Sequence, residues 1–166
     1  MRRVVVTGLG IVSSIGNDAT EVTESLRQAK TGISFSPDFA EHGFKCQVWG
    51  KPDLDPTDLV DRRAMRFLSQ GGAWNHVAMK QAIADSGLEE KDYAENERTG
   101  IIMGSGGPST RTLIEAAEIT IKNNSPKRIG PFAVPKAMSS TASATLATWF
   151  KIHGVNYSIS SACSTS

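Results

Sequence analysis

The sequence predicts an α/β fold, in which helices flank a sheet within one layered domain. Arg2 to Thr7 includes three consecutive valines, a composition typical of a strand buried on both faces. A second apolar strand is expected at Thr99 to Met103, and apolar residues recur at helical spacing before and after it. Residues 1–166 contain no internal repeat or linker, so we expect a single domain.

A helix is expected after the glycine-rich turn that follows the first strand. Asn17 or Asp18 can cap this helix, and its apolar residues continue to Ala29, with Gly32 just past the expected end. Phe44 to Trp49 predicts a short strand. The proline and aspartate residues that come next are typical of an exposed loop.

A long helix is expected from Asp61 to Ser86. Gly87 would end it, although the pair Gly71-Gly72 weakens the middle of the helical pattern. The buried face of this helix would include Leu68, Val77 and Ile83.

Another helix is expected beyond the glycine loop at Gly104, and the polar run at 123–126 would end it. An extended approach between Pro131 and Pro135 is expected after that helix. One side of the helix is apolar and would face the core, with Leu113, Ile114, Ala117 and Ile121.

Cys163 lies where the terminal strand is expected to end. A helix of small residues is expected over Ser139 to Ala147, and Gly154 turns the chain into the strand Asn156 to Ser160. A thiolate just before a helix is favoured by unpaired backbone N–H groups, and the same groups can bind an oxyanion. Cys163 is therefore a candidate nucleophile, while a small, inert, buried cysteine is the alternative interpretation.

Composition narrows the class of protein without naming its chemistry. The chain has 39% apolar and 21% charged residues, as a globular domain with a core requires. Its formal net charge of +1 gives no general attraction to nucleic acid or to anionic membranes. No apolar run is long enough to span a bilayer, and no signal peptide or metal site is evident. Cys46 and Cys163 form no disulfide framework, which favours the reducing cytoplasm.

Several segments of the chain together resemble one enzyme family. They are Val4 to Gly16, the glycine loop Gly104 to Gly107, and a carboxyl-terminal region formed by Lys136 to Ser140 and Leu146 to Ser166. This combination resembles the β-ketoacyl-acyl carrier protein synthases, and among them the class I enzymes. The resemblance implies a thiolase-like layered αβα fold with a mixed sheet flanked by helices. Residues 1–166 would be its incomplete amino-terminal half, ending just past the nucleophile.

The resemblance also implies a reaction. Cys163 would take an acyl group from acyl carrier protein, and the parent enzyme would join it to malonyl-carrier by decarboxylative Claisen condensation in fatty-acid elongation. No metal or other cofactor is expected. Such enzymes carry two catalytic histidines and a lysine in a second half, so residues 1–166 are expected to be inactive alone. A homodimer is also implied, with the terminal strand at the two-fold contact.

Further residues are assigned to substrate and carrier by the same resemblance. Gly107, Met138 and Ala162 would border the acyl pocket, although a tight turn and a core methionine are the plain alternatives for the first two. A solvated face paired with nearby aspartates is the alternative for the basic cluster around residue 63. The residues expected to bind the acidic carrier are Arg62, Arg63, Arg66 and Lys127, and the aspartates are Asp55, Asp58 and Asp61.

Two other functions compete with the condensing enzyme. Gly8-Leu9-Gly10 after a strand could belong to a dinucleotide-binding oxidoreductase, but Ser13 replaces the third glycine and the expected acidic residue is not evident. A non-catalytic scaffold that binds the carrier protein is the other alternative. No convincing base for Cys163 is found among the three histidines, His42, His76 and His153.

Overall fold

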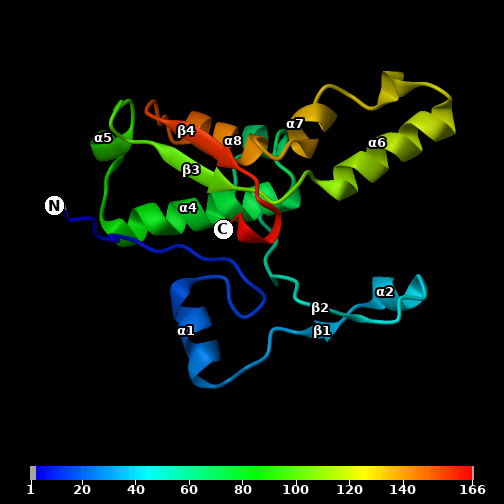
Figure 1. Cartoon of the computed structure of the whole chain (residues 1–166), viewed down its shortest axis with the longest axis horizontal. Helices are drawn as coiled ribbons and strands as arrows, with labels where there is room; N and C mark the ends of the chain where they lie inside the picture. Colours follow the sequence, from blue (N-terminus) through cyan, green and yellow to red (C-terminus); the bar gives the residue numbers. More distant parts are fainter. Residues whose placement is uncertain (1–2, 166) are drawn as a thin grey trace. The chain divides into compact units, whose positions relative to one another are not determined.

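The computed structural model describes residues 3–165, which form two compact units. The first unit consists of the chain up to Asp55 together with Val77–Gly87. The second unit consists of Pro56–His76 and the chain from Leu88 onward. Figure 1 follows the order of the helices and strands along the chain. The assignment of residues 1–166 to a single domain stays a prediction. Within the described residues, none of the helices is both long and apolar enough to cross a bilayer.

The strand predicted at the start of the chain is wrong for the residues that can be described. Arg2 lies outside them, and the backbone from Arg3 onward is extended but belongs to no sheet. Val4 is 94% exposed, because no strand of residues 3–165 pairs with this segment. Further on, the N–H of Leu9 donates instead to the Asp85 carboxylate at 2.8 Å. The N–H of Ile11 donates to the Gln81 side chain at 2.9 Å.

The glycines of this segment lie directly against helix α4 (Gln70–Ser86), the second half of which belongs to the first unit. A Cβ atom added at Gly8 would lie 2.2 Å from the carbonyl oxygen of Ala82. One added at Gly10 would lie 1.8 Å from that of Ala78. These glycines therefore serve close packing of backbone on backbone.

Helix α1 (Ala19–Arg27) begins where the sequence predicted. The Asp18 side chain accepts a hydrogen bond from the Glu21 N–H at 2.8 Å, which confirms Asp18 as the cap. Val22 is buried, whereas Leu26 is exposed. The helix ends before Ala29, whose φ of 52° is left-handed.

A small aromatic cluster organises the rest of the first unit. The strand predicted at 44–49 shrinks to β2 (Val48–Trp49), which pairs antiparallel with the unpredicted β1 (Ser34–Phe35). Between them, the unpredicted helix α2 (Pro37–Glu41) carries Phe39, the ring centroid of which lies 5.0 Å from that of Phe44. The cluster is local, so these short elements need no wider sheet.

The long helix expected from residue 61 to 86 is divided in two. Helix α3 (Arg62–Met65) ends at Arg66, and α4 starts only at Gln70. The break lies ahead of the two glycines because the Ser69 hydroxyl accepts from the Gly72 N–H at 3.3 Å and caps a new helix. The expected end is confirmed, with Gly87 at a φ of +70°.

A parallel pair of strands forms the centre of the second unit. β3 (Ile101–Gly104) pairs with β4 (Asn156–Ile159), as both strand predictions required. Helix α8 (Thr141–Trp149) packs on this pair (Figure 1). Its buried Ser143 hydroxyl lies 2.7 Å from that of Ser158. In residues 3–165 the strands thus form two separate pairs, one antiparallel and one parallel, and not one mixed sheet.

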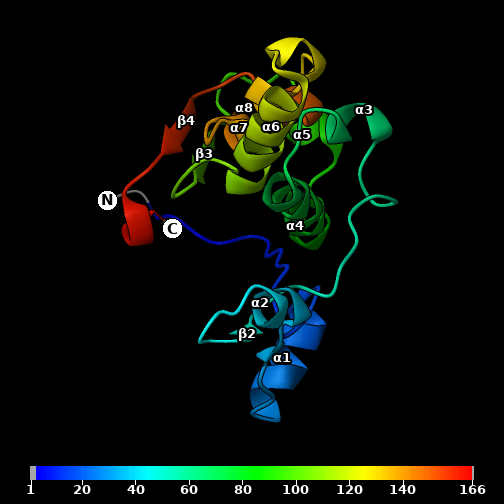
Figure 2. The same cartoon turned by 90° about the vertical axis from the view of Figure 1, so that its right-hand side faces the viewer.

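The crossover between β3 and β4 consists of α6 (Thr110–Asn123), the 3₁₀ turn η1 (Pro126–Arg128), α7 (Ala133–Ala137) and α8 (Figure 2). Helix α6 confirms its prediction, but its expected core side is largely exposed, with Ile121 at 80%. The extended approach expected around Pro135 is wrong. Pro135 lies in the first turn of α7, where its missing N–H is not needed.

Helix α5 (Glu90–Tyr93), which the sequence did not predict, is held by Lys151. The ammonium of Lys151 lies 2.6 Å from the Glu90 carboxylate, and this hydrogen bond and its charge raise the pKa of Lys151 above 10.5. The pair therefore contributes its full stabilisation below about pH 10.5 and loses it as the pH rises through the higher pKa of the folded state.

We expect a small effect, because both side chains are largely exposed. Unfolding free energies of the native protein and a Lys151→Met variant, measured from neutral to alkaline pH, are expected to converge at the alkaline end. Curves that stay parallel would contradict this contribution.

Candidate active site

Cys163 lies on a short turn directly after β4. The turn is the 3₁₀ segment η2 (Ala162–Ser164), and Ala162 within it has a left-handed φ of 51°. The predicted position of Cys163 just after a strand is therefore confirmed, whereas in place of the expected start of a helix the described chain has only a three-residue 3₁₀ turn. Cys163 is a free, exposed cysteine, which argues against the buried, inert alternative.

Hydrogen bonds close this turn around Cys163. The Ser161 N–H donates to Thr165 Oγ1 at 2.8 Å, and the same hydroxyl donates to the Ala162 carbonyl at 2.7 Å. The Ser164 N–H donates to the Ser161 carbonyl at 3.1 Å. None of these three hydrogen bonds uses the N–H of Cys163 itself.

The glycine loop after β3 packs against the Cys163 turn. The Ser105 N–H donates to the Ile159 carbonyl at 3.0 Å and extends the strand pairing. A Cβ atom added at Gly104 would lie 2.5 Å from the Thr165 carbonyl oxygen, and one at Gly106 would lie 3.1 Å from that of Ala162. Only glycine permits this approach at residue 104.

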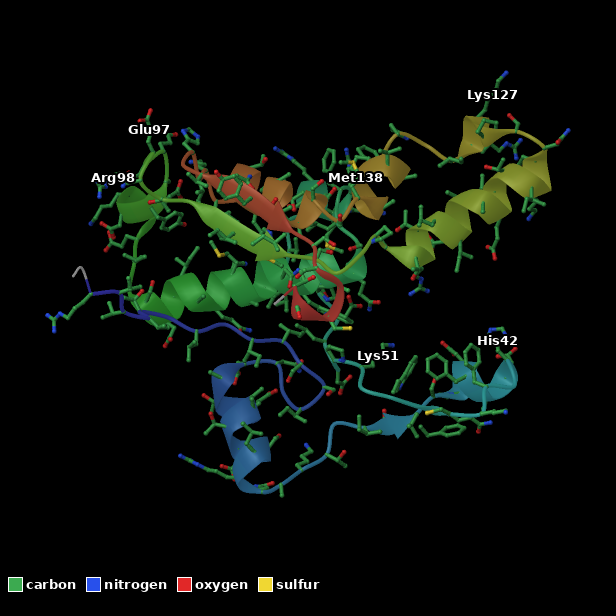
Figure 3. All side chains as sticks on the ribbon, in the orientation of Figure 1. His42, Lys51, Glu97, Arg98, Lys127 and Met138 are labelled. Carbon is green, nitrogen blue, oxygen red and sulfur yellow. The ribbon has the colours of Figure 1, made fainter. Side chains whose placement is uncertain are left out.

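A cleft of about 510 Å³ lies on the other flank of the glycine loop. Gly107 and Met138 both line it, so the structure brings together two of the residues predicted for the acyl pocket. Ala162 and Cys163 do not line it. Figure 3 shows Met138 between α7 and α8, and half of its surface is exposed. The cleft wall also includes residues that the sequence did not assign to a site, among them Leu68, Trp74, Arg111 and Lys136.

The predicted basic residues are exposed and available to a partner. Arg62 and Arg63 lie on α3 and Arg66 ends it, and none of the three forms an ion pair with a residue in the described part of the chain. Asp58 and Asp61 form no ion pair with these arginines among the described residues, so the alternative pairing is not observed for these two aspartates. Asp61 instead caps α3 through the Arg63 N–H at 2.7 Å.

An aromatic contact joins this cluster to the second basic segment. The rings of Phe67 and Phe132 meet edge to face, with centroids 5.1 Å apart. Phe67 directly follows Arg66, and Phe132 follows the turn η1 that carries Lys127. Figure 3 shows the Lys127 side chain projecting outward. Two basic segments that are distant in sequence are therefore held on one unit.

The histidines take other places. His76 is buried on α4, with its ring centroid 5.0 Å from that of Phe150. His153 is exposed and precedes β4, whereas Cys163 follows that strand. His42 ends α2 in the first unit. The prediction that His76 and His153 do not act as the base for Cys163 is consistent with these positions.

The whole chain, residues 1–166, matches the family model described as the amino-terminal domain of β-ketoacyl synthases. It is 51% identical over 166 residues to the 3-oxoacyl-[acyl-carrier-protein] synthase 1 of Escherichia coli (strain K12). The match covers all of this chain and 41% of the length of that protein.

Solved structures confirm the thiolase-like α/β fold. A β-ketoacyl synthase from Burkholderia phymatum matches with a TM-score of 0.81 and 20% identity, over 99% of this chain and 41% of that one. A type II polyketide ketosynthase in complex with its acyl-carrier protein matches with a TM-score of 0.69 and 20% identity, over 93% and 40%. The chain therefore belongs to the β-ketoacyl synthase family and corresponds to its amino-terminal domain.

Proposed function

We propose that Cys163 accepts an acyl group from the thioester of an acyl carrier protein, as the first stage of fatty-acid chain elongation. The observation that carries the proposal is the exposed thiol on a hydrogen-bonded turn beside a glycine loop, in a chain of this family. The Cys163 thiolate attacks the thioester carbonyl, and its own N–H helps to hold the oxyanion. Collapse of this intermediate forms acyl-Cys163 and releases the thiolate of the carrier.

The second stage joins two carbons to the bound acyl group. Malonyl-carrier loses carbon dioxide, and the electron pair of the broken bond forms an enolate at the thioester. Its carbon attacks the carbonyl of acyl-Cys163, and the cysteine leaves as thiolate. We expect the catalytic histidines and lysine for this stage to correspond to the part of the relatives' length that residues 1–166 do not match. Residues 1–166 alone are therefore expected to be inactive in condensation.

Peptide-level mass spectrometry after incubation with an acyl-carrier thioester tests the first stage. The expected result is an acyl mass on the peptide that contains Cys163 and none on the peptide that contains Cys46, the other exposed thiol. An acyl group on both peptides would indicate unspecific thioester exchange. No acylation of the intact protein would contradict the proposal.

The carrier protein is proposed to bind at the basic segments of the second unit. Charge reversal in Arg62→Glu/Arg66→Glu is expected to weaken carrier binding about tenfold or more, since attraction to an acidic partner becomes repulsion. Calorimetric titration with the carrier at low and moderate salt measures the effect, and the loss should shrink as salt screens the charges.

Lys30→Glu/Arg98→Glu is the matched control for this reversal. It changes net charge equally at two exposed residues, and Figure 3 shows Arg98 at the end of its unit opposite to Lys127. Equal losses in both variants would mean that only net charge matters and would contradict a docking site. Lost binding with no thiol acylation in any variant would favour the carrier-binding scaffold.

We further propose a homodimer located in the cytoplasm, with β4 at its contact. All four residues of β4 are exposed, and Tyr157 keeps 61% of its surface. Its outer edge pairs with no strand of residues 3–165, and open strand edges invite pairing with another chain. Sedimentation of the intact protein is expected to give a dimer, and a monomer at all concentrations would contradict this contact.

A further inference from the structure

The hydroxyl of Thr165 links both ends of the turn that carries Cys163. It accepts from the Ser161 N–H, ahead of the cysteine, and donates to the Ala162 carbonyl, with oxygen distances of 2.8 and 2.7 Å. One side-chain oxygen thus uses both its acceptor and its donor capacity on the backbone of a single loop. We refer to these two hydrogen bonds as the Thr165 bridge.

The turn needs such a constraint because its backbone is strained. Ala162 has a left-handed φ of 51°, a conformation that residues with a side chain adopt only when surrounding contacts hold them there. The Ala162 carbonyl is held by the Thr165 hydroxyl itself. The conformation of Ala162 also sets the direction of the Cys163 N–H, which is the next donor along the chain.

The other side of Thr165 is fixed by β3. A Cβ atom added at Gly104 would lie 2.5 Å from the Thr165 carbonyl oxygen and 2.8 Å from its Cγ2 methyl. Thr165 therefore sits directly on the backbone at the end of β3. The methyl and carbonyl locate the residue, and the hydroxyl transfers that location to the loop around Cys163.

We propose that Thr165 is a positioning residue, the hydroxyl of which holds the Cys163 thiol and N–H in the arrangement that accepts an acyl group. This inference rests on the proposed acyl transfer to Cys163. It adds a residue that takes no part in the proposed bond changes and that acts through the Ser161 and Ala162 backbone.

Thr165→Val and Thr165→Ser in the intact protein separate the hydroxyl from the rest of the side chain. Valine keeps the branched shape and removes both hydrogen bonds, whereas serine keeps the hydroxyl. A Cys46→Ser background leaves Cys163 as the cysteine to be followed in residues 1–166. The rate of acyl-Cys163 formation from an acyl-carrier thioester is measured against donor concentration.

We expect Thr165→Val to lower the maximal acylation rate about tenfold, a loss in the range of one or two hydrogen bonds, with an unchanged half-saturating donor concentration. Thr165→Ser is expected to stay within about threefold of the parent. An unchanged rate in the valine variant would overturn the proposal. Equal losses in both variants would also overturn it, because keeping the hydroxyl in serine would then not preserve the acylation rate.

The rate of amide hydrogen exchange at the Ser161 N–H measures whether the Thr165 bridge is formed, and this measurement needs no acyl donor. Exchange is expected to be about tenfold faster in Thr165→Val and unchanged in Thr165→Ser, since the N–H loses its acceptor only in the first. If the parent protein forms no acyl-Cys163, the proposed function fails, while this exchange comparison still supports or overturns the bridge. Unaltered exchange in Thr165→Val would show that the bridge does not hold the turn.

Discussion

Cys163→Ser in the intact protein is expected to abolish the acyl-enzyme and to reduce condensation by on the order of 10⁴-fold or more. The change replaces one sulfur by oxygen on an exposed turn, so the fold should be unaffected. A serine hydroxyl needs a strong base to become a nucleophile, whereas a thiol is partly ionised near neutral pH. Single-turnover acylation with a labelled acyl-carrier thioester measures the loss.

Cys46→Ser supplies the matched control, since it makes the same chemical change at the other exposed thiol. Cys46 lies in the first unit, near β2, and has no role in the proposed reaction. We expect acylation and condensation to stay within about twofold of the native protein, as is usual for exposed substitutions. An acyl-enzyme that persists in Cys163→Ser would mean that another residue carries the acyl group.

Elements with strong local signals were predictable from the sequence. The side chain of Asp18 caps α1, Gly87 ends α4, and the apolar runs became β3 and β4. These features depend on neighbours along the chain, which the sequence displays directly. The short β1 and α2 depend instead on an aromatic cluster, which no periodic pattern in the sequence predicts.

The first strand failed for a different reason. Its valines have the composition of a buried strand, but a strand exists only when another strand accepts its hydrogen bonds, and residues 3–165 supply none. The exposed side of α6 is a second example, since its apolar spacing is helical while Ile114 and Ile121 stay uncovered. Periodicity predicts which side of an element is apolar, not what covers it.

The same distinction between local sequence signals and contacts made only in the folded chain applies to the candidate site. Cys163 was predictable because a small-residue run after an apolar strand places a thiol on a turn, and the family resemblance agreed. Thr165 was missed, because a hydroxyl two residues beyond the thiol is common and only the folded turn shows its two partners. Gly107 and Met138 meet in one cleft through the crossover, which spacing alone could not show.

Gly10→Ala is expected to be the most destabilising single methyl addition in the first unit. The new Cβ would lie 1.8 Å from the Ala78 carbonyl oxygen and 2.8 Å from the Ala82 nitrogen. Both are backbone atoms of α4, so no side chain can turn away and one whole segment must shift. We expect a loss of about 3 kcal/mol in the free energy of unfolding, as severe overpacking gives. Thermal denaturation would show it as a fall on the order of 10 °C in Tm.

Gly71→Ala tests whether the loss comes from the close approach or simply from replacing a glycine. Gly71 lies in the first turn of α4, and a Cβ atom there would meet nothing within 4 Å. Alanine favours the helix over glycine, so this variant should gain up to about 1 kcal/mol. Opposite signs in the two variants would establish that the segment after the valines is held by backbone packing on α4. A neutral Gly10→Ala would instead mean that this segment is not docked on the helix in solution, and its glycines would then be explained by turn formation alone.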